Sequence, residues 1–210
     1  MKESTSKEKM LKKIRKALLE KHENPYPNLE DTPLYPPAGE YLEVLFAEQL
    51  TAVSGKFIFC EDEIQLIENL LLLAEEKEWR KIYCWEPALQ ELLGTYEFPF
   101  YSTDTGFDLA EVGITTCEAL VARNGSVMIS NAGAAGRRLS IYPGTHVVIA
   151  YTSQLVLDLK DAFRLLKGKY RELPSMISNI TGPSRTADIE KTLVLGAHGP
   201  KELIVFLIDK

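Results

Sequence analysis

The stretch Leu203-Ile204-Val205-Phe206-Leu207-Ile208 is an almost continuous apolar run near the end of the 210-residue chain. A strand with one face in water alternates polar and apolar side chains, and this stretch shows no such alternation. It is typical of a strand that is buried on both faces, as the inner strands of parallel sheets are. The stretch therefore predicts an inner strand of a sheet that is covered on both sides.

Shorter apolar runs and helical patterns alternate along the chain before this stretch. The strand-like runs cover residues 57–60, 81–85, 126–130 and 146–150, and the helical patterns cover residues 42–53, 64–74 and 155–166. Strands that alternate with helices along the sequence are typical of α/β proteins. We predict an α/β fold with one open, mostly parallel sheet that is flanked by helices on both sides.

Residues 115–118 have the spacing of a helix capping box. Thr115 can cap the first turn of a helix, and Glu118 can reach back to the cap. Asn124 and Gly125 tolerate the left-handed conformation with which many helices end. The pattern predicts a short helix that begins after Thr115 and ends at Asn124.

The first 39 residues differ in character from the rest. Residues 7–21 carry apolar side chains at helical spacing and lysines on the other face, and residues 24–37 are rich in proline. These patterns predict a basic amphipathic helix and a stiff linker. The helix can bind a membrane surface or an acidic partner, or it can pack on its own domain or a neighbouring subunit. We expect it to reach a partner, as an N-terminal arm formed by residues 1–39, before one α/β domain formed by residues 40–210.

The composition is that of an ordinary globular protein, with 45% hydrophobic and 26% charged residues. The net charge of −6 argues against a general nucleic-acid binder, which would carry a basic excess. No apolar run approaches the roughly 20 residues that a membrane-crossing helix needs. The N-terminus lacks the apolar segment of a secretory signal. We therefore expect a cytoplasmic protein with no membrane span and no nucleic-acid partner.

The residues that usually bind metals are scattered. Cys60, Cys84 and Cys117 are far apart and form no C-x-x-C pair, which argues against a disulfide framework and against an iron–sulfur or zinc site. Of the histidines, His22 is expected to be solvated, and His146 opens an apolar run and is expected to be structural. We expect neither a metal nor a bound cofactor.

The densest group of unusual residues is Thr181-Gly182-Pro183-Ser184-Arg185-Thr186-Ala187-Asp188-Ile189-Glu190. Gly182 permits close backbone approach, and Ser184 and Thr186 offer hydroxyl donors. Arg185 presents a guanidinium group that suits a carboxylate or a phosphate. The following residues can form a helix whose N-terminal amides would point at the same anion, with Asp188 as a general base. The residues leave open a second interpretation, a capped turn with a surface arginine.

Two further loops carry candidate site residues. His198 lies between glycines in Gly196-Ala197-His198-Gly199-Pro200, where it can act as an acid–base group or hold the turn by hydrogen bonds. The glycine-rich residues 131–138 end in Arg137 and Arg138 and match no nucleotide-binding glycine motif. This loop can still bring two arginines to the end of a sheet, where ligands of α/β proteins usually bind.

Several short motifs together resemble the LUD-domain (DUF162, LutC-like) family. In chain order they are Gly113-Ile114-Thr115, Asn124-Gly125-Ser126, Leu139-Ser140 with Pro143 and His146, residues 182–190, and Gly196-x-His198-Gly199-Pro200. The resemblance spans residues 40–210. Gly125 and Ser126 belong to this pattern, and we include both in the predicted anion-binding set.

The resemblance implies properties that composition and spacing do not. It implies a NagB/RpiA/CoA-transferase-like α/β architecture and a role in the oxidation of L-lactate to pyruvate, beside iron–sulfur companion proteins. It assigns no catalytic residue. One departure is Asn124, where relatives often have threonine, and this difference changes at most a local hydrogen bond.

Two functions remain open. The chain can be an accessory, non-redox subunit of a lactate-oxidising complex that binds a small anion and iron–sulfur partners. Alternatively it is a free-standing enzyme acting on a small carboxylate or a phosphate- or CoA-type metabolite, with Arg185 as anion clamp and His198 or Asp188 as acid–base group. We favour the accessory role because lactate oxidation needs an electron acceptor and the sequence has no motif for flavin, NAD or iron–sulfur. Whether the chain forms a homo-oligomer stays open.

Overall fold

The computed structural model describes residues 5–19, 35, 39, 41–187 and 193–210. The chain divides into two compact units, Met1–Pro37 and Ala38–Lys210. Apart from Tyr35, the proline-rich segment predicted as a linker lies outside the described residues. In the described part of the chain, no helix combines the length and the apolar character that a membrane crossing requires.

The first unit contains helix α1 (Ser6–Leu19), which the amphipathic pattern predicted. The helix begins at a capping box. The amide of Glu8 donates to Thr5 Oγ1 at 3.3 Å, and the amide of Thr5 donates to Glu8 Oε2 at 2.9 Å. Each bond satisfies an amide that the first turn of a helix leaves without a partner.

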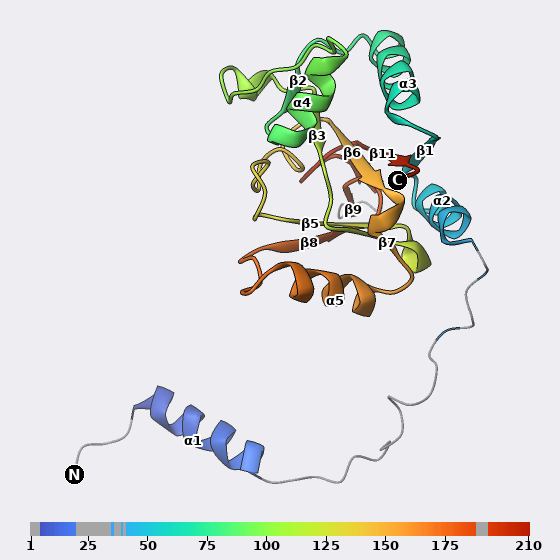
Figure 1. Ribbon diagram of the computed structural model, residues 1–210. Helices are drawn as coiled ribbons and strands as arrows, with labels where there is room; N and C mark the ends of the chain where they lie inside the picture. The colour runs from blue at the N-terminus through green and yellow to red at the C-terminus, as the bar shows by residue number, and fades with distance from the viewer. Residues whose placement is uncertain (1–4, 20–34, 36–38, 40, 188–192) are drawn as a thin grey trace. The chain divides into compact units, whose positions relative to one another are not determined.

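The second unit is built on a five-stranded parallel sheet with the strand order β1-β11-β6-β3-β2. The strands are β1 (Lys56–Cys60), β2 (Ile82–Cys84), β3 (Val112–Thr115), β6 (Thr145–Tyr151) and β11 (Glu202–Ile208). The apolar stretch at residues 203–208 is therefore an inner strand, as predicted. Figure 1 shows the sheet in the middle of this unit.

The inner strands β6 and β11 are buried on both faces, which explains their apolar sequences. In β6, Val147 and Ile149 pack into one hydrophobic core, and Val148 and Ala150 pack into the other. The residues of β11 divide between the same two cores in the same alternating way. Burial of each such side chain stabilises the fold by about 1.5–3 kcal/mol. Because these strands bury the side chains on both faces, they bury more apolar side chains per residue than a strand with one face in water.

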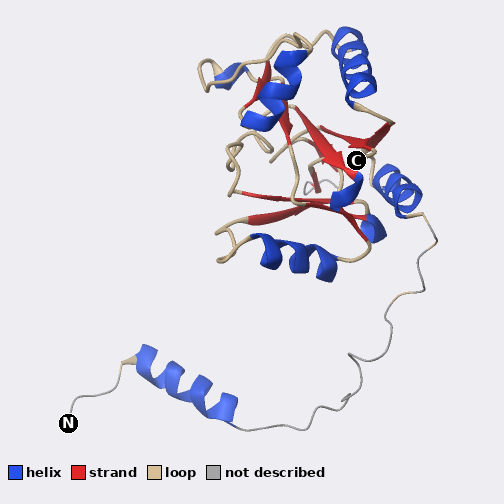
Figure 2. Ribbon diagram, in the orientation of Figure 1, coloured by secondary structure: helices blue, strands red, loops and turns tan. Residues whose placement is uncertain are grey.

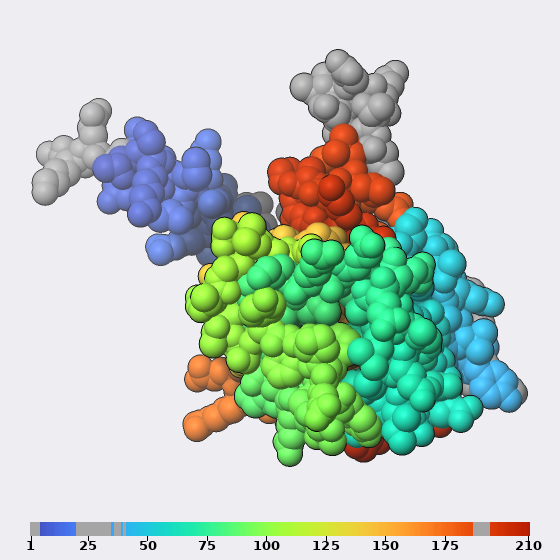
Figure 3. Space-filling view, turned by 90° about the horizontal axis from the view of Figure 1, so that it is seen from above, coloured from blue at the N-terminus to red at the C-terminus, as the bar shows by residue number. Residues whose placement is uncertain are grey.

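Helices α3 (Glu63–Glu76) and α4 (Pro87–Thr95) cover one face of the sheet, and α2 (Leu42–Ala52) packs on the other. Asp62 caps α3 by accepting the amide of Gln65 at 2.8 Å. Pro87 occupies the first turn of α4, where its missing amide donor costs nothing. The teal and green residues of α3, α4 and the segment after α4 form much of the face seen in Figure 3.

A second, four-stranded sheet lies against the face of the parallel sheet that α2 covers, whereas the sequence predicts a single sheet and, of these four strands, only the one at residues 126–130. Its order is β7-β4-β5-β8, and its outer face is covered by α5 (Leu159–Lys169). Its strands are β4 (Ala119–Val121), β5 (Ser126–Ser130), β7 (Leu155–Val156) and β8 (Ile177–Ile180). The unit thus has layers of helix, sheet, sheet and helix (Figure 2).

The helix predicted after Thr115 is wrong. Thr115 is the last residue of β3, and residues 119–121 form strand β4. The Thr115 hydroxyl donates to the carbonyl of Thr116 at 2.9 Å and does not cap a helix. Only the three residues Ala122–Asn124 form a 3-10 turn, η3, before Gly125 adopts the predicted left-handed conformation. The strands of this sheet are short, so their sequence patterns are weaker than the capping-box pattern that predicts a helix here.

The residues after Arg185 that the structure describes do not form the predicted helix, and residues 188–192 lie outside the described part of the chain. Strands β9 (Arg185–Ala187) and β10 (Leu193–Leu195) pair in an antiparallel hairpin instead. The orange-red residues of this hairpin stand out from their surroundings in Figure 3. Two 3-10 turns, η2 (Phe107–Leu109) and η4 (Thr152–Gln154), complete the described secondary structure.

Gly125 fixes how α2 packs on the second sheet. It has φ +60°, and a Cβ atom placed on it would lie 2.2 Å from the backbone nitrogen of Leu50 in α2. A side chain at this position therefore meets both an unfavourable backbone conformation and the helix backbone.

We expect Gly125→Ala to lower the free energy of unfolding by about 2 kcal/mol or more, since the left-handed conformation alone costs about 1–2 kcal/mol. Gly94→Ala in α4 is the matched control, because nothing lies within 4 Å of its added Cβ. That substitution should stabilise the helix by about 0.5–1 kcal/mol. Urea denaturation measures both, and equal stability of the Gly125 variant and the parent protein would contradict the packing described.

Candidate functional site

A cavity of about 150 Å³ lies where β6 and β11 begin, and we call it the histidine cavity. It is lined by residues of three segments: Ser140, Ile141 and His146; Ile180, Gly182, Pro183 and Ser184; and His198, Gly199, Pro200 and Leu203. Segments that are far apart in the sequence therefore meet here. Gly182, Ser184 and His198, three of the predicted site residues, share this cavity.

His146 is the most deeply buried polar residue of the cavity, with 0% of its surface exposed. Its Nε2 lies 2.8 Å from Thr115 Oγ1. Burial away from water lowers the pKa of His146 to about 4, so the imidazole is neutral near pH 7. Among the described residues no atom is a hydrogen-bond partner for its Nδ1. The structural role that the sequence predicts for His146 explains its contact with Thr115. It does not explain why Nδ1 is buried without a hydrogen-bond partner among the described residues.

Beside the cavity is an open groove of about 370 Å³, which we call the arginine groove. Its lining comprises Arg137, Arg138, Ile141, Tyr142 and the Gly196, Ala197, His198 and Gly199 loop. Ile141, His198 and Gly199 line both the groove and the histidine cavity, so the two spaces adjoin.

The two arginines of the groove are held by neighbouring side chains. Arg137 Nη2 donates to Ser175 Oγ at 3.1 Å. Arg138 lies 5.2 Å from the ring centre of Trp85 and 3.3 Å from Asp104 Oδ2, a pair in which both side chains are mostly exposed. Exposed pairs of this kind contribute little, so the guanidinium charge stays available. No acidic side chain is among the described residues that line the groove.

Arg185 lies outside both spaces. Its Nη2 donates to the carbonyl of Val53, just after α2. Gly182 faces the same carbonyl, because a Cβ atom placed on it would be 2.2 Å from Val53 O. Thr186 is part of β9, and Asp188 lies outside the described residues. The hairpin segment therefore packs on the end of α2, and only its first residues reach the cavity.

Gly125 and Ser126 also lie away from the cavity and the groove. Ser126 is fully buried, and its Oγ is 2.6 Å from Thr181 Oγ1. The contact joins β5 to the segment that leads into the 182–187 loop. The positions of both residues are explained by packing between β5, α2 and this loop.

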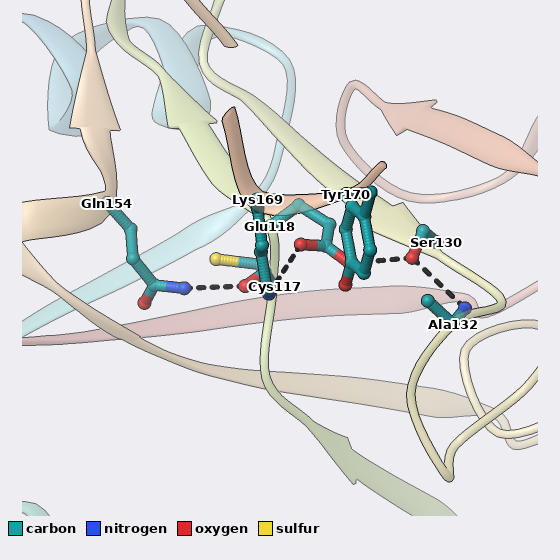
Figure 4. Close-up of polar contacts among 7 residues, drawn as sticks. All are labelled: Cys117, Glu118, Ser130, Ala132, Gln154, Lys169 and Tyr170. Carbon is teal, nitrogen blue, oxygen red and sulfur yellow. Dashed lines mark hydrogen bonds and ion pairs between the residues drawn. The ribbon is translucent and has the colours of Figure 1, made fainter. Parts of the chain in front are cut away.

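A second pocket, of about 110 Å³, lies beyond the carboxyl ends of β2 and β3, and we call it the glutamate pocket. Glu118 is at its centre. Its Oε1 accepts from Ser130 Oγ at 2.6 Å and from Tyr170 Oη at 2.8 Å, and its Oε2 lies 2.8 Å from Lys169 Nζ. Figure 4 shows these side chains converging from β5 and the end of α5.

Glu86 faces the same pocket, and the two carboxyl groups have opposite electrostatic surroundings. Burial, together with the charge of Glu118, raises the pKa of Glu86, even though the amide of Thr116 donates to its Oε2 at 2.5 Å. Burial also opposes ionisation of Glu118, but hydrogen bonds from Lys169, Ser130 and Tyr170 hold its pKa below the usual value. Carboxyl pairs whose pKa values are pushed apart are typical of acid–base sites.

Sequence reasoning missed this pocket. The capping-box pattern places Glu118 at a helix cap, and none of the motifs in the sequence includes Glu86. The position of Glu86 in the sequence could have indicated the pocket. Glu86 directly follows a predicted strand, and ligand sites of parallel sheets form at the carboxyl ends of the strands. Ser140, which is 3% exposed, lines both this pocket and the histidine cavity, and its Oγ is without a partner among the described residues.

The cysteines are free and buried. Burial raises the pKa of the Cys84 thiol to about 12, and it raises that of Cys117 as well. These thiols are therefore protonated and unreactive near pH 7. The described residues contain no group of three or more His, Cys, Asp or Glu side chains that could hold a metal ion.

Because the pKa values of Glu86 and Glu118 are shifted in opposite directions, the stabilities of Glu86→Gln and Glu118→Gln should depend on pH in opposite ways. The raised pKa of Glu86 means that its contribution to stability is present below its unfolded pKa and is lost as the pH rises through the folded pKa. Glu86→Gln should therefore become more stable than the parent as the pH rises from 4 to 8. Each unit by which the folded pKa exceeds the unfolded one corresponds to about 1.4 kcal/mol.

The lowered pKa of Glu118 gives the reverse. Its contribution is present above the unfolded pKa and is lost as the pH falls through the folded value. Glu118→Gln should cost about 2 kcal/mol at pH 7, where charged hydrogen bonds are broken, and less at pH 4. Denaturation midpoints measured across this range check both signs, and parallel pH curves for the two variants would contradict the assignment.

Comparisons with known proteins place the chain in a family. The LUD domain family model matches residues 100–208, which include every residue that lines the histidine cavity and the arginine groove. The chain is 39% identical over 103 residues to lactate utilization protein C of Bacillus velezensis. The matched residues cover 48% of this chain and 43% of that protein. Over 183 residues it is 27% identical to the protein of the same name from Geobacillus kaustophilus, covering 80% of this chain and 72% of that protein.

The chain spans less than half the length of the first of these relatives. The crystal structure of a DUF162 family protein from Deinococcus radiodurans shares the fold with a TM-score of 0.59 at 16% identity, covering 82% of this chain and 99% of that one. The predicted α/β fold is thereby confirmed. Because the family model covers more than half of the sequence, the predicted resemblance is confirmed too: the chain belongs to the LUD domain family.

Proposed function

We propose that this protein takes part in lactate utilisation by binding a small carboxylate in the arginine groove and the adjoining histidine cavity. The similarity to proteins named lactate utilization protein C supports the general role. The observation that carries the site is the lining of the groove, which includes Arg137, Arg138 and His198 and, among the described lining residues, no acidic side chain; Asp104, which pairs with Arg138, is not part of the lining. Guanidinium groups pair well with carboxylates.

The size of the two spaces suits such a ligand. The histidine cavity measures about 150 Å³, and a water molecule takes about 30 Å³ of liquid volume. A carboxylate with a short carbon chain therefore fits, with its charge toward the groove and its chain in the cavity. Ser184 and Gly182, which the sequence predicts to bind an anion, line the histidine cavity.

The proposed role is that of an accessory subunit in the cytoplasm. Oxidation of lactate moves two electrons to a redox centre, and centres of that kind are cofactors rather than side chains. The three dispersed cysteines of this chain do not make an iron–sulfur motif. We propose that iron–sulfur partner proteins accept the electrons while this chain holds the anion.

One observation favours an alternative, a free-standing enzyme acting on a small carboxylate or a phosphate- or CoA-type metabolite. The glutamate pocket contains two carboxyl groups with pKa values shifted in opposite directions. Glu86 can then act as proton donor, with Glu118 as the fixed negative charge that holds Lys169. The pairing of His198 with Asp188 as acid–base groups stays a prediction.

A thermal-shift titration tests the proposed carboxylate site. Sodium L-lactate should raise the melting temperature of the parent protein relative to sodium chloride at equal ionic strength, by the equivalent of about 2.7 kcal/mol at 100 times Kd. The double variant Arg137→Ala, Arg138→Ala should lose the shift. Arg185→Ala should keep it, because Arg185 contacts Val53 outside the groove.

Either of two results would count against this site. If Arg185→Ala loses the rise in melting temperature and the double variant keeps it, the anion binds at the 182–187 loop and not in the groove. No shift of the parent protein with L-lactate or pyruvate would remove the carboxylate-binding proposal altogether.

The two functions differ in what the purified protein does alone. As an accessory subunit it binds the carboxylate without turnover, and affinity capture from lactate-grown cells recovers iron–sulfur proteins. As an enzyme it forms product, and Glu86→Gln abolishes turnover while carboxylate binding persists. Product formation by the isolated parent protein, followed by mass spectrometry, would decide for the enzyme.

A further inference from the structure

Two residues that line the histidine cavity each carry a buried polar atom without a hydrogen-bond partner among the described residues, Ser140 Oγ and His146 Nδ1. Ser140 is 3% exposed and His146 is 0% exposed, so bulk water does not satisfy these atoms. Buried polar groups are nearly always paired in folded proteins, and each exception calls for an explanation such as a bound water or ion, strain or a catalytic role. The pairing of two such atoms in one cavity points to a bound group that satisfies both.

The hydrogen bonds of Thr115 define what His146 offers. The Thr115 hydroxyl has a single hydrogen, which it donates to the carbonyl of Thr116 at 2.9 Å. Its contact with His146 Nε2 at 2.8 Å is then one in which Nε2–H is the donor. A neutral imidazole carries one N–H, so Nδ1 carries a lone pair and can only accept. Burial holds the pKa of His146 at about 4, which keeps this state near pH 7.

We propose that His146 Nδ1 accepts a hydrogen bond from the hydroxyl group of an α-hydroxy carboxylate, so that the cavity selects a hydroxy acid over the corresponding keto acid. The inference rests on the proposed carboxylate site and adds a specificity-determining residue to it. One hydroxyl group can donate to Nδ1 and accept from Ser140 Oγ. A keto oxygen has no hydrogen to donate, and it would place a second acceptor against Nδ1.

The remaining walls fit the rest of such a ligand. Ile141, Ile180 and Leu203 give the cavity apolar surface for a short alkyl group. The side of the cavity that His198 and Gly199 share with the arginine groove gives the carboxylate access to two guanidinium groups. Charge is thus recognised at the groove and the hydroxyl group at His146, in the neutral interior.

Calorimetric titration with L-lactate, pyruvate and propionate tests the selectivity. L-lactate should bind about tenfold more tightly than pyruvate or propionate, because a buried site built for a hydroxyl group leaves its own atoms unpaired when that group is missing. Ser140→Ala should weaken L-lactate about fivefold, as expected for one neutral hydrogen bond, and leave propionate, which has no α oxygen to accept that bond, unchanged. His146→Phe should bring L-lactate to the level of pyruvate.

Thr145→Val is the matched control in the same strand, because Thr145 precedes His146 and does not line the cavity. It should keep the preference for L-lactate. If His146→Phe does not fold, Ser140→Ala still tests the proposal, since its hydroxyl has no partner to lose among the described residues.

A spectroscopic reading reports on His146 directly. In protein with ¹⁵N-labelled histidine, the resonance of the unprotonated Nδ1 should move on addition of L-lactate and stay in place with propionate. Equal affinities for L-lactate and pyruvate, both lost in the Arg137→Ala, Arg138→Ala variant, would overturn the role of His146 and keep the carboxylate site. An unmoved Nδ1 resonance at saturating L-lactate would do the same. No binding of any of the three acids would overturn both proposals.

Discussion

The double burial of β6 and β11 is the constraint on which the rest of the structure depends. Each strand sends alternate side chains into two separate cores, so each core needs its own cover. Helices α3 and α4 cover one face of the parallel sheet, and α2 and the second sheet cover the other. The burial of apolar area on both sides is the main favourable term in folding, and a polar residue within these strands is tolerated only if it is paired.

His146 is the consequence of this constraint for function. As the second residue of β6, it faces the core between the two sheets, where a histidine loses its charge and needs partners for both ring nitrogens. Thr115, at the end of the neighbouring strand β3, pairs with one nitrogen. The other has no hydrogen-bond partner among the described residues, and His146 lines a cavity to which three segments of the chain contribute. The same burial that stabilises the sheet therefore creates a neutral, directional acceptor next to a positively charged groove.

The parts of the fold that rest on long apolar runs could be predicted from sequence, because burial on both faces leaves an unbroken pattern. Strands 57–60, 81–85, 146–150 and 203–208 and the helix at residues 64–74 belong to this class. Of the second sheet only the strand at residues 126–130 could be predicted, because the other strands are short and exist only by packing on α2, α5 and the parallel sheet. The same reason explains why the helix predicted at residues 115–124 is wrong. The capping pattern is local, whereas packing against the rest of the fold makes residues 119–121 a strand.

Some of the residues predicted for the site lie together in the structure. The structure groups Gly182, Ser184 and His198 in one cavity and Arg137 and Arg138 with His198 in the adjoining groove. Arg185 was the most prominent residue in the sequence, but no pattern shows which way a side chain points, and it packs on Val53 instead. We propose that this groove binds a carboxylate. A crystal structure with L-lactate should show the carboxylate between Arg137, Arg138 and His198, whereas ligand density in the glutamate pocket alone would contradict it.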